Sequence, residues 1–232
     1  MASTLELYHW EISPFCEKVR RILDYKGLPY RTITQPLTRR PLLQSRTGQQ
    51  KVPVLRDGET WVADSTDIAR YLEERYPEKP VLPTSGRDRA LCLLIEDWAD
   101  EAFASSVQPA KWLSPGNFSI LAGRMREELT GPVNNLLLTV AKPVLQKQMR
   151  EYLHGRGMKR NATVLTDQLD QLEVLLESQS YLFGDTPTVA DFAVAALLKE
   201  LKGLKGWEIV AAHPRVLALT ERIESISSAR VA

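Results

Sequence analysis

The chain has 232 residues, of which 44% are hydrophobic and 25% are charged, and its formal net charge is +1. This ordinary globular composition excludes a disordered chain, a collagen-like repeat and a disulfide scaffold. The near-neutral charge gives no general electrostatic basis for binding nucleic acid or an anionic membrane. The length is sufficient for two small domains.

Cysteine and histidine are scarce. The two cysteines, Cys16 and Cys92, form no disulfide framework, which is typical of a reducing compartment. Together with three scattered histidines they offer no metal-ligand spacing, so we expect no metal site. The chain shows no signal-peptide pattern, and no apolar run approaches the ~20 residues of a membrane span. We therefore expect a soluble, cytoplasmic protein with no membrane partner.

The first 76 residues change element type at short intervals, which is typical of an α/β unit. Ser13 is a helix cap, Pro14 suits the first helical position, and Gly27 suits the helix end. Asp57-Gly58 is a hairpin signal, so the sheet combines an antiparallel hairpin with parallel crossovers. The predicted order is β-α-β-α-β-β-α with a mixed four-stranded sheet: strand 5–9, helix from 14, strand 30–33, a short helix within 39–45, strand 52–55, strand 60–62, and a helix capped by Asp64 or Ser65.

The rest of the chain is predicted to be all-helical. Residues 77–86 contain three prolines and indicate a linker. The domains are therefore predicted at 1–76 and 87–232. Thr188 and Asp191 have the spacing of a capping box and are assigned to structure. Helices are expected at 87–112, at 118–152 with breaks near its prolines, at 161–178, at 192–201, and from Pro214 onward.

The tetrapeptide Ser13-Pro14-Phe15-Cys16 is the first candidate for chemistry. A helix N-terminus offers unpaired N–H groups and a partial positive charge, which stabilise a thiolate and lower its pKa. The Ser13 hydroxyl could donate a hydrogen bond to such a sulfur. The structural alternative is that Ser13 only caps the helix and Cys16 is a buried helix residue.

Three motifs, taken with their order along the chain and their places in the predicted α/β unit, carry a resemblance to a known family: Ser13-Pro14-Phe15-Cys16, Val52-Pro53 and Asp64-Ser65. The chain resembles the serine-type cytosolic glutathione transferases. The resemblance implies a thioredoxin-like N-terminal domain in which the Ser13 hydroxyl stabilises the glutathione thiolate. It also implies that Pro53 is cis and that Val52 binds the cysteinyl backbone of glutathione as an added strand. Cys16 departs from the serine-type pattern and leaves thiol–disulfide exchange open.

The resemblance assigns the two ends of glutathione as well. The Ser65 hydroxyl and the free N–H groups at that helix start would hold the γ-glutamyl carboxylate. Asp64 would pair with the γ-glutamyl amino group, and Lys51 would meet the glycyl carboxylate. Simple helix capping and a solvated surface lysine are the structural alternatives.

Four aromatic residues are weaker candidates for an apolar second-substrate pocket, because aromatic side chains more often belong to the core. The four candidates are Trp10, Phe103, Trp112 and Phe118.

Tyr8 lies inside the first predicted strand and is expected to pack in the core rather than take part in catalysis.

The resemblance implies a detoxification enzyme that conjugates glutathione to a small hydrophobic electrophile. Glutathione would be a cosubstrate, with no further cofactor, and the chain would form a homodimer. Two alternatives remain. One is a glutathione-dependent thiol transferase or dehydroascorbate reductase that uses Cys16, and the other is a non-catalytic glutathione- or ligand-binding protein.

Overall fold

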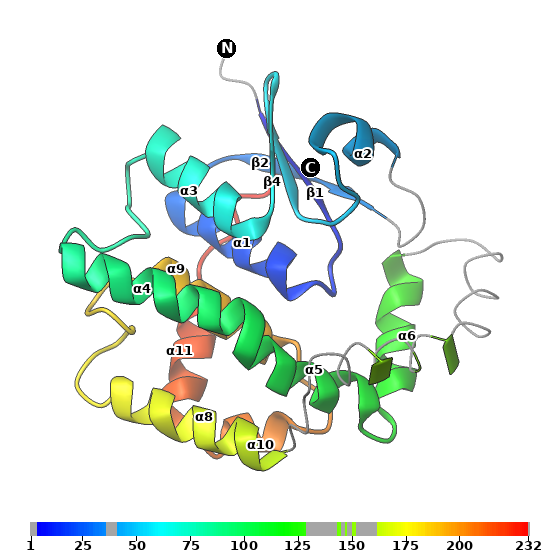
Figure 1. Cartoon of the computed structure of the whole chain (residues 1–232), viewed down its shortest axis with the longest axis vertical. Coiled ribbons are helices and arrows are strands. Elements are labelled where there is room, and N and C mark those ends of the chain that lie inside the picture. Colours follow the sequence, from blue (N-terminus) through cyan, green and yellow to red (C-terminus); the bar gives the residue numbers. More distant parts are fainter. Residues whose placement is uncertain are drawn as a thin grey trace.

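The computed structural model describes residues 4–35, 41–128, 143–144, 147, 150–151 and 162–231. Its first part is a four-stranded mixed sheet with helices on both faces, as predicted (Figure 1). The strand order is β2-β1-β3-β4, with β1 parallel to β2 and antiparallel to β3. The elements are β1 (Leu5–His9), α1 (Pro14–Lys26), β2 (Tyr30–Thr34), α2 (Pro41–Thr47), β3 (Val54–Asp57), β4 (Thr60–Ala63) and α3 (Ser65–Arg75).

Alternation along the strands assigns the two faces of this sheet. Leu7 and Leu55 are register partners and belong to the main core with α1 and α3. Tyr8 and Val54 point the other way and pack with Leu43 of α2. Tyr8 is buried and lies 5.2 Å from the ring of Trp61, which fits the packing role predicted for it.

Local signals set most of the boundaries. Ser13 caps α1, and Gly27 ends it with a left-handed φ of 68°, which glycine adopts without steric cost. The Val52–Pro53 peptide is cis. Strand β3 covers 54–57 rather than the predicted 52–55, because Pro53 has no N–H to donate to the sheet.

The second part contains only helices among the described residues. The helix predicted over 87–112 is confirmed, and it contains a π-helical turn that was not predicted. The predicted helix over 118–152 lies partly outside the described residues, and α10 was not predicted. The elements are α4 (Gly86–Trp98), η1 (Ala99–Phe103, the π-helical turn), α5 (Ala104–Leu113), α6 (Asn117–Glu128), α8 (Ala162–Leu175), α9 (Val189–Lys199), α10 (Trp207–Ala211) and α11 (Pro214–Glu224).

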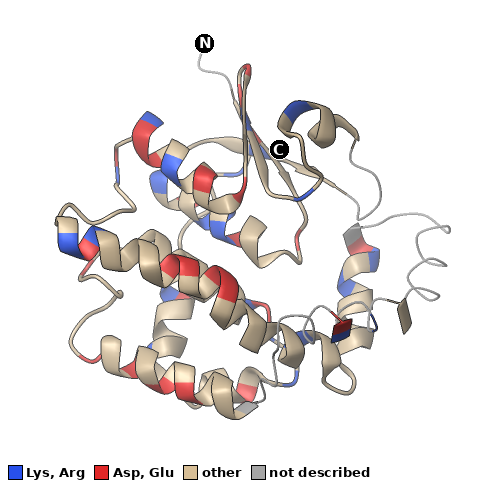
Figure 2. Cartoon of the chain, viewed as in Figure 1, with Lys and Arg blue, Asp and Glu red and all other residues tan. Residues whose placement is uncertain are grey.

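The two parts share one hydrophobic core, in which α1 packs against α9 and lies near α4 (Figure 1). The predicted capping box begins α9, where Asp191 accepts the Thr188 N–H at 2.8 Å. Figure 2 shows acidic residues along the C-terminal half of α4, on the helix that passes beside α1. Among the described residues, no helix combines the length and apolar character needed to cross a membrane.

Candidate active site

Ser13 lies at the N-terminus of α1, immediately after a short loop from β1. Its hydroxyl oxygen accepts the Cys16 N–H at 3.4 Å, and its carbonyl accepts the Glu17 N–H at 2.9 Å. A serine hydroxyl has one hydrogen to donate and two acceptor lone pairs, so capping the helix leaves its hydrogen available to a ligand. The helix behind it has 13 residues, and its partial positive charge acts on the same point.

Cys16 occupies a different environment. Its side chain is fully buried, and its sulfur accepts the Trp10 N–H at 3.4 Å. It does not line the apolar cavity that Ser13 lines or the polar cavity at the start of α3, both of which are described below. Cys16 therefore packs behind the loop and supports it, whereas reactive cysteines are partly exposed.

The residues predicted to bind glutathione gather around one polar cavity of about 720 Å³. They come from the loop before β3 and from the start of α3, and α3 follows β4, the strand next to β3 in the sheet. The five residues are Lys51, Val52, Pro53, Asp64 and Ser65.

The N-terminus of α3 is built by Asp64 and Ser65. Asp64 caps the helix by accepting the Thr66 N–H at 2.9 Å, and its φ of 79° is unusual for a residue other than glycine. Strained backbone of this kind concentrates at ligand sites. Ser65 is the first helical residue, is 3% exposed and lines the polar cavity. The free N–H groups of this helix start suit an anionic group.

A second, more apolar cavity of about 250 Å³ lies against Ser13. Of the four predicted aromatic residues, Trp10 and Trp112 line it. The structure does not place Phe103 or Phe118 there. Phe103 is fully buried and stacks on Trp98 at 5.0 Å, and Phe118 is also buried, so the core takes both rings.

The two cavities share two lining residues, Phe15 and Asp100. A ligand group in the polar cavity is therefore next to the apolar cavity that Ser13 lines. Asp100 lies in the π-helical turn, a feature that often marks functional positions in helices.

Sequence analysis missed Asp100 and its neighbours. Asp97, Asp100 and Glu101 all line the polar cavity, and their spacing of three and four residues places them on one helix face. That acidic spacing is the signal that could have found them. Asp100 accepts a hydrogen bond from the buried Lys18 at 2.6 Å, and Lys18 also pairs with Glu96. Burial raises the pKa of Asp100 to about 6, although the Lys18 charge opposes this.

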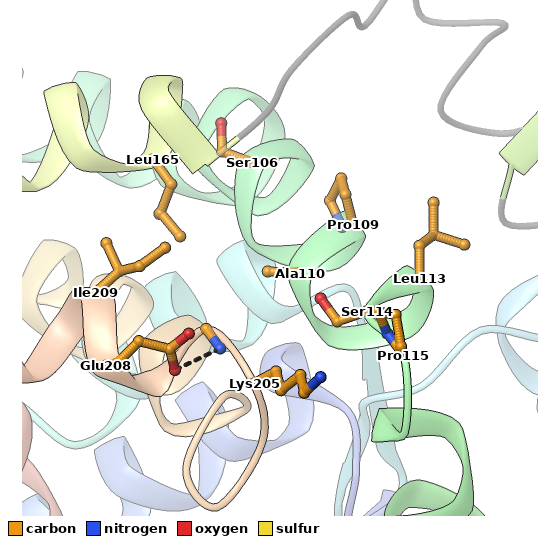
Figure 3. A pocket seen from close by; sticks show the side chains of 11 residues that line it. Ser106, Pro109, Ala110, Leu113, Ser114, Pro115, Leu165, Lys205, Glu208 and Ile209 are labelled. Carbon is orange, nitrogen blue, oxygen red and sulfur yellow. Dashed lines mark hydrogen bonds between the residues drawn. The ribbon is translucent and has the colours of Figure 1, made fainter.

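Another cavity, of about 440 Å³, lies in the helical part between α5, α8 and α10 (Figure 3). Its wall is mostly apolar and includes Pro109, and Leu165 and Ile209 point toward one another across it. It shares no lining residue with the polar cavity or with the apolar cavity that Ser13 lines. Apart from Cys16, Phe103 and Phe118, the predicted site residues line the pair of cavities at α1 and α3.

Comparison with known proteins matches both parts of the chain. The family model "Glutathione S-transferase, N-terminal domain" matches residues 7–80, and "Glutathione S-transferase, C-terminal domain" matches residues 158–222. Together they cover more than half of the chain. The first match includes Ser13, the Val52–Pro53 peptide and the Asp64–Ser65 helix start.

Individual relatives agree with these models. A zeta-class glutathione S-transferase from Euphorbia esula is 36% identical over 118 residues, or 49% of this chain, and the match spans about half (51%) of that relative. Glutathione S-transferase 4 from Zea mays is 26% identical over 92% of this chain and 85% of its own length.

A solved glutathione S-transferase from Rhodospirillum rubrum F11 has the same fold. Its TM-score is 0.68 at 22% identity, over 96% of this chain and 88% of that one. The fold, the order of the motifs and the matches to both domains lead to one conclusion: the chain belongs to the glutathione S-transferase family.

Proposed function

We propose that the protein transfers glutathione to a small hydrophobic electrophile. The observation that carries this proposal is that a polar and an apolar cavity meet at Phe15 and Asp100, with Ser13 on the apolar side at a helix N-terminus. A charged tripeptide fits the first cavity and an apolar electrophile fits the second. The arrangement brings nucleophile and electrophile together, and such positioning contributes much of the rate enhancement in two-substrate reactions.

Glutathione carries two carboxylates and one ammonium group, and the polar cavity offers groups of matching charge. Ser65 and the N–H groups at the start of α3 would hold the γ-glutamyl carboxylate, with Asp64 on the ammonium group. Val52 would pair its backbone with the cysteinyl unit, and Lys51 would meet the glycyl carboxylate. The thiol then points toward the N-terminus of α1.

The reaction proposed is nucleophilic attack by the thiolate. The thiol loses its proton to solvent, and the Ser13 hydroxyl and the α1 N-terminus stabilise the resulting anion. The sulfur forms a bond to an electrophilic carbon. With an aryl halide the halide ion leaves with the bonding electrons, and with an activated alkene the carbanion takes a proton from water. Ser13 forms no covalent bond in either case.

Activity assays with three substrate classes test this proposal. An aryl halide should be conjugated, whereas mixed disulfides and dehydroascorbate should be reduced slowly, because Cys16 is buried away from both cavities. Reduction that exceeds conjugation and disappears in Cys16→Ser would establish the redox alternative. Glutathione binding without turnover of any class would establish a non-catalytic binding protein.

We also propose that the protein is a homodimer, which is an expectation from the family. Leu91 and Leu94 of α4 are 38% and 64% exposed, so they offer apolar surface that a second copy could cover. Light scattering at micromolar concentration should give twice the mass of the chain. Leu94→Glu should give the mass of one chain, and a wild-type mass of one chain would contradict the proposal.

A further inference from the structure

The loop Trp10–Ser13, which joins β1 to α1, decides where the catalytic hydroxyl lies. The loop closes on itself, because the Ser13 N–H donates to the Trp10 carbonyl at 3.1 Å. Its first N–H, on Trp10, reaches the Cys16 sulfur at 3.4 Å. The two carbonyls in the middle of the loop, those of Glu11 and Ile12, are held by other parts of the protein.

Lys111 holds the Ile12 carbonyl. It extends from α5 of the helical part, is 1% exposed, and its Nζ donates to the Ile12 carbonyl at 2.9 Å. The same Nζ forms an ion pair with Glu200, which directly follows α9 and is also buried. Since the Ile12 carbonyl belongs to the peptide bond that ends at the Ser13 nitrogen, Lys111 acts one bond away from the catalytic residue.

Arg20 holds the preceding carbonyl from inside the N-terminal domain. Its Nη2 donates to the Glu11 carbonyl at 3.1 Å and to the Glu17 carboxylate at 2.6 Å. Its Nη1 lies 2.7 Å from Nδ1 of His9, whose pKa burial and the Arg20 charge lower to about 3. Two consecutive carbonyls thus accept hydrogen bonds from two buried basic side chains, and Lys111 is the one that the helical part supplies.

A buried ion pair is a costly way to stabilise a fold, because desolvation offsets much of the attraction between the charges. Lys111 lines both the apolar cavity beside Ser13 and a cavity of about 210 Å³ behind the loop. An apolar side chain could fill that space but could not bond the carbonyl. The pair therefore fits a role in fixing the loop better than a role in stability alone.

We propose that the Lys111–Glu200 ion pair of the helical part is the positioning device for Ser13. By holding the Ile12 carbonyl, it sets the distance between the Ser13 hydroxyl and the glutathione thiolate. This inference rests on the proposed function, in which that hydroxyl stabilises the thiolate. Its consequence is that the helical part contributes to activating the nucleophile although the motifs for glutathione lie in the N-terminal domain.

The test is the ultraviolet absorbance of bound glutathione thiolate followed against pH. Lys111→Met keeps most of the side-chain length and removes the donor. It should raise the pH midpoint of the bound thiolate by about one unit and lower kcat about threefold at neutral pH, while the glutathione Kd changes less than about threefold. Adding it to Ser13→Ala should give no further rise, because both changes remove the same hydrogen bond to sulfur.

The matched control is Lys26→Met. Lys26 is also buried, pairs with Glu73 and donates to the Tyr76 carbonyl at 2.8 Å, but it lies at the far end of α1. It should lower stability and leave the thiolate midpoint where it is. An unchanged midpoint in Lys111→Met, or equal rises in both lysine variants, would overturn the inference.

Glu200→Gln covers the case in which Lys111→Met does not fold. It removes the ion partner at constant volume and should raise the midpoint by about half a unit, and no rise would overturn the inference. A different result would contradict the proposed function itself. If wild-type protein does not lower the midpoint of glutathione, the proposed function is wrong. If it does, and Ser13→Ala raises the midpoint while the Lys111 and Glu200 variants do not, only the inference is wrong.

Discussion

Replacing Ser13 with alanine tests the role of its hydroxyl. A free thiol titrates near ~8.5, and a hydrogen bond from a hydroxyl to an anion contributes about 1.5–3 kcal/mol. The N-terminus of α1, at which Ser13 is the cap, adds up to about 1 kcal/mol. Together these stabilise the thiolate by roughly 2.7 kcal/mol, enough to lower the pKa of the bound thiol by about two, to about 6.5.

Loss of the hydroxyl leaves the helix contribution and returns the thiol to a pKa of about 8. The ionised fraction at neutral pH then falls from roughly three quarters to roughly one tenth, so conjugation should slow about eightfold. At about pH 9 both proteins hold mostly thiolate, and the difference should nearly vanish. The assay is kcat for an aryl halide at saturating glutathione, measured from mildly acidic to alkaline pH.

Two variants separate this effect from loss of the helix cap. Ser85 caps α4 in the same way, because its hydroxyl oxygen accepts the Asp88 N–H at 3.4 Å, so Ser85→Ala removes an equivalent cap elsewhere. It should cost about 1 kcal/mol of stability, as Ser13→Ala does, without changing the pH profile. Ser13→Thr keeps the hydroxyl and should retain most activity. A Ser13→Ala profile that equals wild type, or that is reduced equally at all pH values, would refute the mechanism.

Three further predictions follow from the described contacts. Cys16→Ser should lower thermal stability but keep the conjugation rate within about twofold of wild type, because the sulfur is buried and accepts a hydrogen bond from the Trp10 N–H. Loss of activity in Cys16→Ser with retention in Ser13→Ala would instead support the redox alternative. Ser65→Ala should weaken glutathione binding about tenfold by calorimetry without moving the thiol pKa, since in the proposed binding mode Ser65 holds the γ-glutamyl end, away from the thiol. An unchanged Kd would remove Ser65 from the site. Glu17→Gln should destabilise the fold by about 3–5 kcal/mol at neutral pH in denaturant titrations, because Glu17 is buried and pairs with Arg20, Arg21 and Lys199. Burial raises the pKa of Glu17, but the Arg20, Lys199 and Arg21 charges outweigh it and hold that pKa well below its ordinary value. The stabilisation is therefore present above the unfolded pKa of about 4.3 and is lost as pH falls through the folded value, so the loss of stability in Glu17→Gln should shrink below about pH 4. A loss of stability that does not depend on pH would contradict this account. The surface control is Glu59→Gln, at a side chain that is 98% exposed.

The sequence predicted those features that local chemistry decides. Ser13-Pro14 starts α1 because serine caps a helix and proline suits its first position, and Gly27 ends it because glycine accepts a left-handed φ. Asp57-Gly58 predicted the turn between β3 and β4. The residues proposed to bind glutathione were named from the resemblance to the glutathione transferases, and the structure places them around one cavity.

The remaining features depend on contacts between distant residues. Lys18 and Glu96 pair across 78 positions, and Lys111 reaches the Ile12 carbonyl across 99, which no local pattern encodes. The π-helical turn at Ala99–Phe103 interrupts a sequence that reads as one helix. Phe103 was predicted to line a ligand pocket, but a fully buried position beside Trp98 takes its ring instead. Hydrophobic residues alone do not reveal which apolar surface is a cavity and which is core.

The proposed function depends most on the polar cavity at the start of α3 binding glutathione through its charged ends. Calorimetric titration of the wild-type protein with glutathione tests this most directly, with cysteinylglycine as the matched ligand that lacks the γ-glutamyl unit. We predict saturable binding of glutathione below millimolar concentration and no measurable binding of cysteinylglycine, because the start of α3 would lose both of its charged partners. The absence of saturable heat with glutathione at millimolar concentration, or equal binding of the two ligands, would contradict the account.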